Sequence, residues 1–112
     1  MYIFTSKIGR YRAGGALDIT VKGQDPVGRI FAPTWDMVMG VKNGTISHDE
    51  YIKQYLPILA AVPHRYPDQL AKIMTSSKVL LLCYCKQYAF CHRDLVSTWL
   101  VEKGATYGGY IE

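Results

Sequence analysis

The residues best suited to chemical reactions lie close together near the C-terminus. Cys83, Cys85 and Cys91 are the three cysteines of the chain and fall within nine positions, and His92 follows the last of them. Thiols and imidazoles serve proteins as nucleophiles, proton carriers and metal ligands. The segment 83–93 is therefore the predicted functional pole.

Cys91 is the predicted nucleophile, with His92 as the residue that moves a proton. Both stand where the last predicted helix begins, and the amides of a helix N-terminus, together with the nearby cation of Arg93, favour a thiolate. We therefore expect a lowered pKa at Cys91. The alternative interpretation is a small buried Cys91 and a His92 bonded to a carbonyl or carboxylate in the core.

The same helix start is a predicted anion site, because its unpaired amides and partial positive charge attract phosphate. A glycine-rich loop between the first two predicted strands adds two arginines. Aromatic residues of the cysteine loop could stack on a base, or could pack in the core instead. The predicted ligand-binding residues are Arg93, Lys86, Cys83, Cys85, Tyr84, Arg10 and Arg12.

Asp18 is the one acid inside a predicted strand. If that strand neighbours the one that ends at Cys83, its carboxylate lies near the same pole. There it could act as a catalytic base or hold a ribose hydroxyl. The alternative is a structural partner for Arg10, Arg12 or a backbone amide.

A metal is the other chemistry that this segment allows. Cys83, Cys85, Cys91 and His92 supply four soft ligands. Zinc knuckles space their cysteines by two to four residues, whereas here the first gap is one and the last two ligands are adjacent, which strains a tetrahedral site. We therefore predict no metal ligand and no cofactor, with a Cys/His metal or thiol redox module as an alternative.

The elements that must position these residues follow from the apolar pattern. Residues 78–83 form a continuous apolar run, which predicts a strand buried on both faces of a parallel sheet. Residues 92–103 place apolar side chains at helical spacing, and Ser47 with Glu50 predicts the start of another helix. Further strands are predicted over 2–5, 16–21 and 107–111, and further helices over 34–41 and 68–74.

Pro57 lies inside the helix that begins at Ser47. Because proline removes a backbone donor, we expect a kink or a break near residues 53–57. Alternation of strands and helices predicts one domain over residues 1–112, a small Rossmann-like α/β fold with a mainly parallel sheet flanked by helices. In such sheets ligands bind beyond the carboxyl ends of the strands, where the cysteine loop is expected.

The pattern of these residues resembles a known family. Leu-Leu-Cys-Tyr-Cys at 81–85 with Cys-His-Arg-Asp-Leu-Val at 91–96 is similar to the C-terminal signature of the domain-of-unknown-function 488 family. Segments 16–20, 31–33 and 47–59 also look like the earlier part of that family. The resemblance implies a Rossmann-like α/β domain. The extra cysteine at Cys85 resembles related small families common in phages and mobile elements.

The composition is that of a globular chain of 112 residues with a formal net charge of +4. Residues 1–33 hold five Lys and Arg against two Asp, a balance that attracts phosphate groups. Clustered cysteines in odd number do not resemble a secreted disulfide framework, and the first residues contain no apolar run long enough for a signal peptide or a membrane span. We therefore expect a cytoplasmic protein with no membrane partner.

The predicted function is the binding of a nucleotide or nucleoside-like, phosphate-bearing ligand at the cysteine loop. The protein would then be a nucleotide- or base-modifying enzyme of bacterial or phage origin, or a phage protein that sequesters its ligand. The alternatives are a nucleic-acid-binding accessory protein that uses the basic N-terminal half, and the metal or redox module. Tyrosine patches could also form the face of a homo-oligomer.

Overall fold

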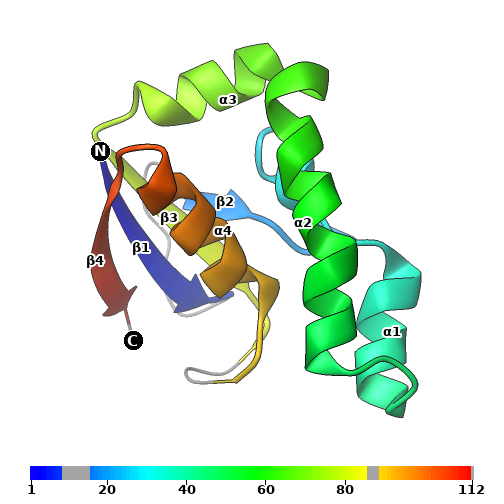
Figure 1. The fold of residues 1–112 in the computed structure, drawn as a ribbon. Coiled ribbons are helices and arrows are strands. Elements are labelled where there is room, and N and C mark those ends of the chain that lie inside the picture. Colours follow the sequence, from blue (N-terminus) through cyan, green and yellow to red (C-terminus); the bar gives the residue numbers. More distant parts are fainter. Residues whose placement is uncertain (9–15, 86–88, 112) are drawn as a thin grey trace.

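Four parallel strands form the centre of the part of the molecule that the structure describes (Figure 1). The computed structural model describes residues 1–8, 16–85 and 89–111. The strands are β1 (Tyr2–Lys7), β2 (Ala16–Asp18), β3 (Lys78–Cys83) and β4 (Thr106–Ile111), and their order in the sheet is β2-β3-β1-β4. Every pair is parallel. With the helices around this sheet, the fold is the small Rossmann-like α/β fold that the sequence predicts.

Strand β3 confirms the prediction of a buried central strand. It pairs with β1 on one side and with β2 on the other, and Val79, Leu80 and Leu81 are all buried. Consecutive residues of a strand point to opposite faces, so the burial of all three means that both faces of β3 are covered, which suits a continuous apolar run. β3 ends at Cys83, so the cysteine loop leaves from the carboxyl edge of the sheet.

In the described part of the chain, four α-helices and a short 3-10 helix, η1 (Gly28–Phe31), flank the sheet. The α-helices are α1 (Trp35–Asn43), α2 (His48–Arg65), α3 (Pro67–Met74) and α4 (His92–Glu102). Side-chain caps fix two of the starts, since the backbone N–H of Met37 donates to Thr34 Oγ1 and that of Glu50 donates to Ser47 Oγ. The predicted helix starts in this part of the sequence are thereby confirmed.

The expected break at Pro57 is wrong, because α2 is one helix from His48 to Arg65 with Pro57 inside it. Pro57 is exposed, while Tyr51, Tyr55 and Leu59 of the same helix are buried. The hydrogen bond that proline removes lies on the solvent side, and packing of the opposite side stabilises the helix.

Strand β2 is shorter than the prediction of 16–21, because it ends at Asp18. The Asp18 carboxylate accepts hydrogen bonds from the Thr20 N–H at 3.0 Å and from Thr20 Oγ1 at 2.6 Å. An aspartate that bonds the backbone two residues ahead turns the chain, and the strand cannot continue through that turn.

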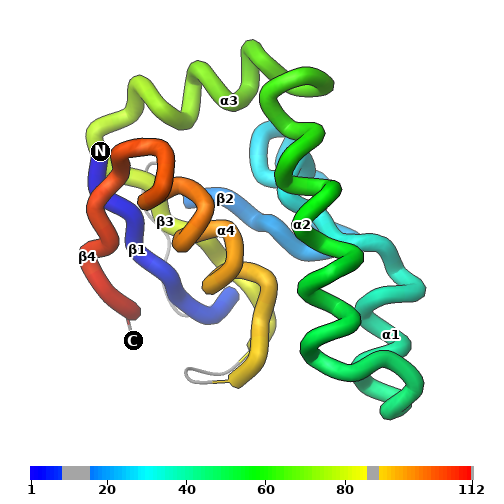
Figure 2. The backbone as a smooth tube through the Cα atoms, in the orientation of Figure 1, coloured from blue at the N-terminus to red at the C-terminus, as the bar shows by residue number. Residues whose placement is uncertain are grey.

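The main core lies between the sheet and α4, which crosses the strands in Figures 1 and 2 and contacts β1, β3 and β4. Ile3 and Leu81 of the sheet belong to the same apolar cluster as Val96 and Leu100 of α4. Helix α2 packs beside α4, and α1 lies on its outer side. No helix in the described part of the chain is long and apolar enough to cross a membrane.

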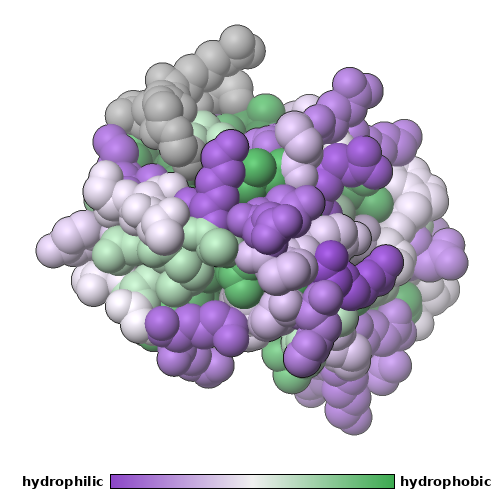
Figure 3. Space-filling view, turned by 90° about the horizontal axis from the view of Figure 1, so that it is seen from above, coloured by the Kyte–Doolittle hydropathy of each residue, from purple (hydrophilic) through white to green (hydrophobic). Residues whose placement is uncertain are grey.

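Figure 3 shows the molecule from above the view of Figure 1, on the side of α3. Hydrophilic residues are spread over the coloured part of this face, and the most hydrophobic ones form only small separate areas. The cysteine loop lies at the other end of the strands (Figure 1).

Candidate functional site

A pocket of about 290 Å³ opens at the carboxyl ends of β2 and β3. Its walls come from the turn after β2, from α1 and α2, and from the cysteine loop up to the start of α4. The walls are mostly apolar, and they include Trp35, Tyr51, Tyr84 and Phe90. This is the location that the parallel-sheet rule predicts for a ligand.

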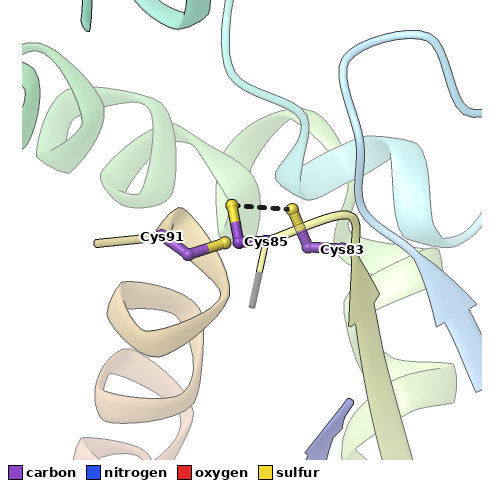
Figure 4. Close-up of side chains that lie close together, drawn as sticks. All are labelled: Cys83, Cys85 and Cys91. Carbon is purple, nitrogen blue, oxygen red and sulfur yellow. Dashed lines mark hydrogen bonds between the residues drawn. The ribbon is translucent and has the colours of Figure 1, made fainter. Parts of the chain in front are cut away.

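All three cysteines line the pocket and form one cluster (Figure 4). Cys83 stands at the end of β3, Cys91 is the N-cap residue of α4, and Cys85 comes from the loop between them. Their Sγ atoms lie within 4.8 Å of one another, and the thiol of Cys83 donates to Cys85 Sγ at 3.7 Å. The cysteines are free, with Cys83 and Cys91 buried and Cys85 half-buried.

The cluster concentrates thiolate character on Cys85. Hydrogen bonds from the thiols of Cys83 and Cys91 lower the pKa of Cys85 to about 3, burial opposes this effect, and the charge of Arg93 assists it. Donation to Cys83 and Cys85, together with burial, raises the pKa of Cys91 well above its ordinary value. The expectation of a lowered pKa at Cys91 is therefore wrong, because its donation to the other two sulfur atoms and its burial favour the protonated thiol.

His92 is held in a defined tautomer. Its Nε2 lies 2.7 Å from the carbonyl oxygen of Ile19, and since a carbonyl only accepts, Nε2 carries the proton and donates it. The other ring nitrogen, Nδ1, lies 3.9 Å from Cys91 Sγ. The ring is buried and meets Tyr55 edge-on. His92 therefore has the carbonyl bond of a core histidine and also a nitrogen that faces a thiol.

Arg93 stabilises the cysteine loop by hydrogen bonding to its backbone. Its side chain is 1% exposed, and Nη1 donates to the carbonyl oxygen of Cys85 at 2.8 Å and to that of Ser6 at 3.2 Å. The guanidinium also lies 5.2 Å from the ring centre of Tyr110. Among the described residues, Arg93 is not part of the pocket wall, so its role as a phosphate ligand stays a prediction.

The strand that carries Asp18 neighbours β3, which is the condition for Asp18 to lie near the cysteines, and Asp18 is paired in register with Leu82. Its carboxylate shapes the turn that carries Thr20 and Lys22 into the pocket wall. A Cβ added at Gly23 would lie 2.7 Å from the Asp18 carboxyl carbon, so a larger residue there would displace this carboxylate. The described wall does not include Asp18 itself, and its role as a base stays a prediction.

The aromatic residues of the loop divide between the surface and the wall. Tyr84 is 67% exposed at the pocket, whereas Phe90 stacks on His48 at 4.0 Å and meets Tyr51 edge-on. Burial and the charges of the nearby cysteines raise the pKa of Tyr51, so its phenol stays neutral. The predicted residues Arg10, Arg12, Lys86 and Tyr88 lie outside the described residues.

Sequence reasoning missed part of the wall. Trp35 and Lys42 of α1 and Lys22 of the turn after β2 line the pocket, and Lys22 Nζ lies 4.4 Å from the centre of the Trp35 ring. No local motif marks these residues. Trp35 and Lys42 reach the pocket because α1 packs on α2, and Lys22 reaches it through the turn after β2.

The fold and the site define a class: a small Rossmann-like α/β protein with a thiol-lined pocket at the carboxyl edge of its sheet. The chain belongs to the DUF488-N3a family, whose description is the active DUF488-N3 subclade and whose model matches residues 11–104. This match confirms the resemblance noted in the sequence. No curated protein and no solved structure gives a significant match to the chain.

Proposed function

We propose that the pocket binds a nucleotide or nucleoside-like ligand and that the protein is an enzyme that modifies it. The observation that carries this proposal is the pocket itself. Small-molecule sites are concave, mostly apolar and upwards of roughly 300 Å³ in volume, with a few polar groups. At about 290 Å³, with Trp35 and Tyr84 in its walls, this pocket suits a planar base.

Positive charge at the pocket supports a phosphate-bearing ligand. Lys22 and Lys42 are both part of the wall, and the start of α4 contributes Cys91 and His92 to it. A helix N-terminus and two ammonium groups favour an anion over a neutral molecule. The formal net charge of +4 acts in the same direction at longer range.

The thiols supply the chemistry in this proposal. The Cys85 thiolate would form a bond to an electrophilic carbon of the ligand while the bond from that carbon to its leaving group breaks. Water would then release the product from Cys85, and His92 Nδ1, which carries no proton, would accept the proton of that water. The family description, which calls the subclade active, supports an enzyme over a sequestering protein. We further propose a cytoplasmic location in a bacterium or a phage-infected cell, where free thiols are kept reduced.

The first test is native mass spectrometry of the reduced protein with a panel of nucleosides and nucleotides. We expect a bound ligand whose mass is lost on denaturation. Trp35→Ala should weaken the binding of nucleosides and nucleotides alike, and Lys22→Ala and Lys42→Ala should weaken only the phosphorylated ones. Lys53→Ala is the matched control, because Lys53 is exposed on α2 and is not part of the described wall. No binding across the panel would contradict the proposal.

The second test separates an enzyme from a simple binder. We expect Cys85→Ser to retain the ligand but to lose turnover, measured as product by chromatography. Unchanged turnover in this variant would rule out the Cys85 thiolate as the reacting group. Binding without product in the wild-type protein would instead favour sequestration.

A further inference from the structure

We propose that the Sγ atoms of Cys83, Cys85 and Cys91 form a three-thiolate site for a thiophilic cation of the zinc class, with the fourth coordination position open to the pocket. This inference goes beyond the proposed function and does not depend on it, and the proposed reaction of the Cys85 thiolate is that of the metal-free protein. It rests on the spacing of the sulfurs, on the elements that hold them, on the charge around them and on the position of the pocket.

The spacing of the sulfur atoms is that of ligands around one ion. Zinc binds thiolate sulfur at about 2.3 Å, so two sulfurs of a tetrahedral site lie about 3.8 Å apart. The Sγ atoms of Cys83 and Cys85 are 3.7 Å apart, and Cys91 Sγ lies within 4.8 Å of both. Only a small shift of Cys91 is needed to complete a trigonal face. The short spacing in the sequence is therefore no obstacle, since the chain folds back and α4 presents Cys91 to the other two.

Rigid elements hold the three ligands in place. Cys83 ends a central strand and Cys91 caps a helix, so the backbone of each is fixed by regular structure. Cys85 lies in the loop, but the Arg93 guanidinium holds its carbonyl oxygen at 2.8 Å. A site that exists before the metal arrives loses little conformational entropy on binding, which favours affinity.

The charges around the cluster suit a metal thiolate. Three thiolates around a divalent cation leave one net negative charge, which must be balanced in a buried place. The buried guanidinium of Arg93 lies directly behind the loop, and the N-terminus of α4 points at Cys91. Both features stabilise the anionic complex, and the nearby carboxylate of Asp94 opposes them.

The fourth position faces the pocket. Cys83, Cys85 and Cys91 all line the cavity, so a bound ion would be reached from it. His92 Nδ1 lies 3.9 Å from Cys91 Sγ, but the hydrogen bond from Nε2 to Ile19 restrains the ring, and His92 is outside the set of ligand atoms that lie within 4.8 Å of one another. A site with three protein ligands and one exchangeable position can bind water or a ligand from the pocket.

The test titrates the reduced, metal-free full chain with Zn²⁺ against a chromogenic chelator and with Co²⁺ in a spectrometer. We expect one equivalent of each, with sulfur-to-cobalt charge-transfer bands in the cobalt spectrum. Cys83→Ser, Cys85→Ser and Cys91→Ser should each weaken binding by at least about tenfold, since even the loss of an outer-shell group costs that much. His64→Ala is the matched control, because His64 is exposed on α2, and it should bind as the wild type does.

A second measurement uses only the wild-type protein, so its result does not depend on whether the variants fold. One equivalent of Zn²⁺ should protect the thiols from an alkylating reagent, and a chelator should restore their reactivity. Absence of this protection, or binding that persists when the three cysteines are replaced together, would overturn the inference. Ligand binding by the metal-free protein is scored separately, so a failed metal site leaves the proposed function standing, and the reverse also holds.

Discussion

The two halves of helix α4 differ in how their side chains are buried. The C-terminal half buries Leu100 in the main apolar cluster. The N-terminal turn buries His92 and Arg93, whose polar atoms donate to backbone carbonyls of β1, the cysteine loop and the residue after β2. Burial of polar groups costs free energy unless each is bonded, so the first turn is built to position groups and the second half to stabilise the fold.

Removal of core volume from the apolar half should have the largest effect on stability. Leu100 is 0% exposed, and Leu100→Ala should lower the free energy of unfolding by about 3 kcal/mol. Val101→Ala is the matched control on the same helix, because Val101 is 40% exposed and should cost less than about 1 kcal/mol. Denaturant unfolding measures both, and equal losses would contradict the burial of Leu100 in the apolar core.

Arg93→Met tests the polar turn and should have the next largest effect. The variant keeps an apolar stem but loses the bonds to Cys85 O and Ser6 O, so we expect a loss of about 2 kcal/mol in unfolding free energy. It should also raise the pKa of Cys85, which thiol alkylation at different pH values would detect. Arg65→Met, on the exposed end of α2, is the control and should change neither quantity.

Asp18→Asn asks whether the acid beside β3 positions the pocket or takes part in chemistry. Loss of charge on the acceptor of the two Thr20 bonds should cost about 1 kcal/mol of stability. We expect ligand affinity and turnover to fall together, since the variant disturbs the turn that carries Lys22. A fall in turnover with unchanged affinity would assign Asp18 to the reaction instead.

The smallest expected effect is the pH dependence contributed by the cysteine cluster. Bonds from the Cys83 and Cys91 thiols lower the pKa of Cys85 from its ordinary value of 9.0 to about 3, so its thiolate adds stability that is full above pH 9 and is lost as the pH falls toward 3. The raised pKa of Cys91 has the opposite effect, because it makes the folded state less stable as the pH rises above 9. The stability difference between wild type and Cys85→Ser should therefore grow between about pH 5 and about pH 8. Solvent screening of the half-buried Cys85 keeps the change small, and a difference that shrinks with pH would contradict the assignment of the thiolate.

Most of the fold could be predicted from local patterns. The continuous apolar run gives β3 with the same ends as in the structure, and the spacing of apolar residues gives α4 to within one residue. Two predictions about the fold were wrong, the break at Pro57 and the length of β2, and each has its cause in the surroundings of one side chain. Pro57 does not end α2 because its lost bond lies on the exposed side, and β2 stops early because the Asp18 side chain competes with strand pairing.

The sequence by itself determined which residues stand at the carboxyl edge of the sheet, because the order of strand, loop and helix places 83–93 there whatever the packing. Tertiary structure alone decided which of them meet. The return of α4 brings Cys91 to Cys83 and Cys85, and α1 adds Trp35 and Lys42 to the wall. The pKa of a thiol depends on charges and hydrogen bonds within a few ångströms, and those neighbours come from segments far apart in the chain. For that reason the sequence located the thiols and only the packing assigned the thiolate to Cys85.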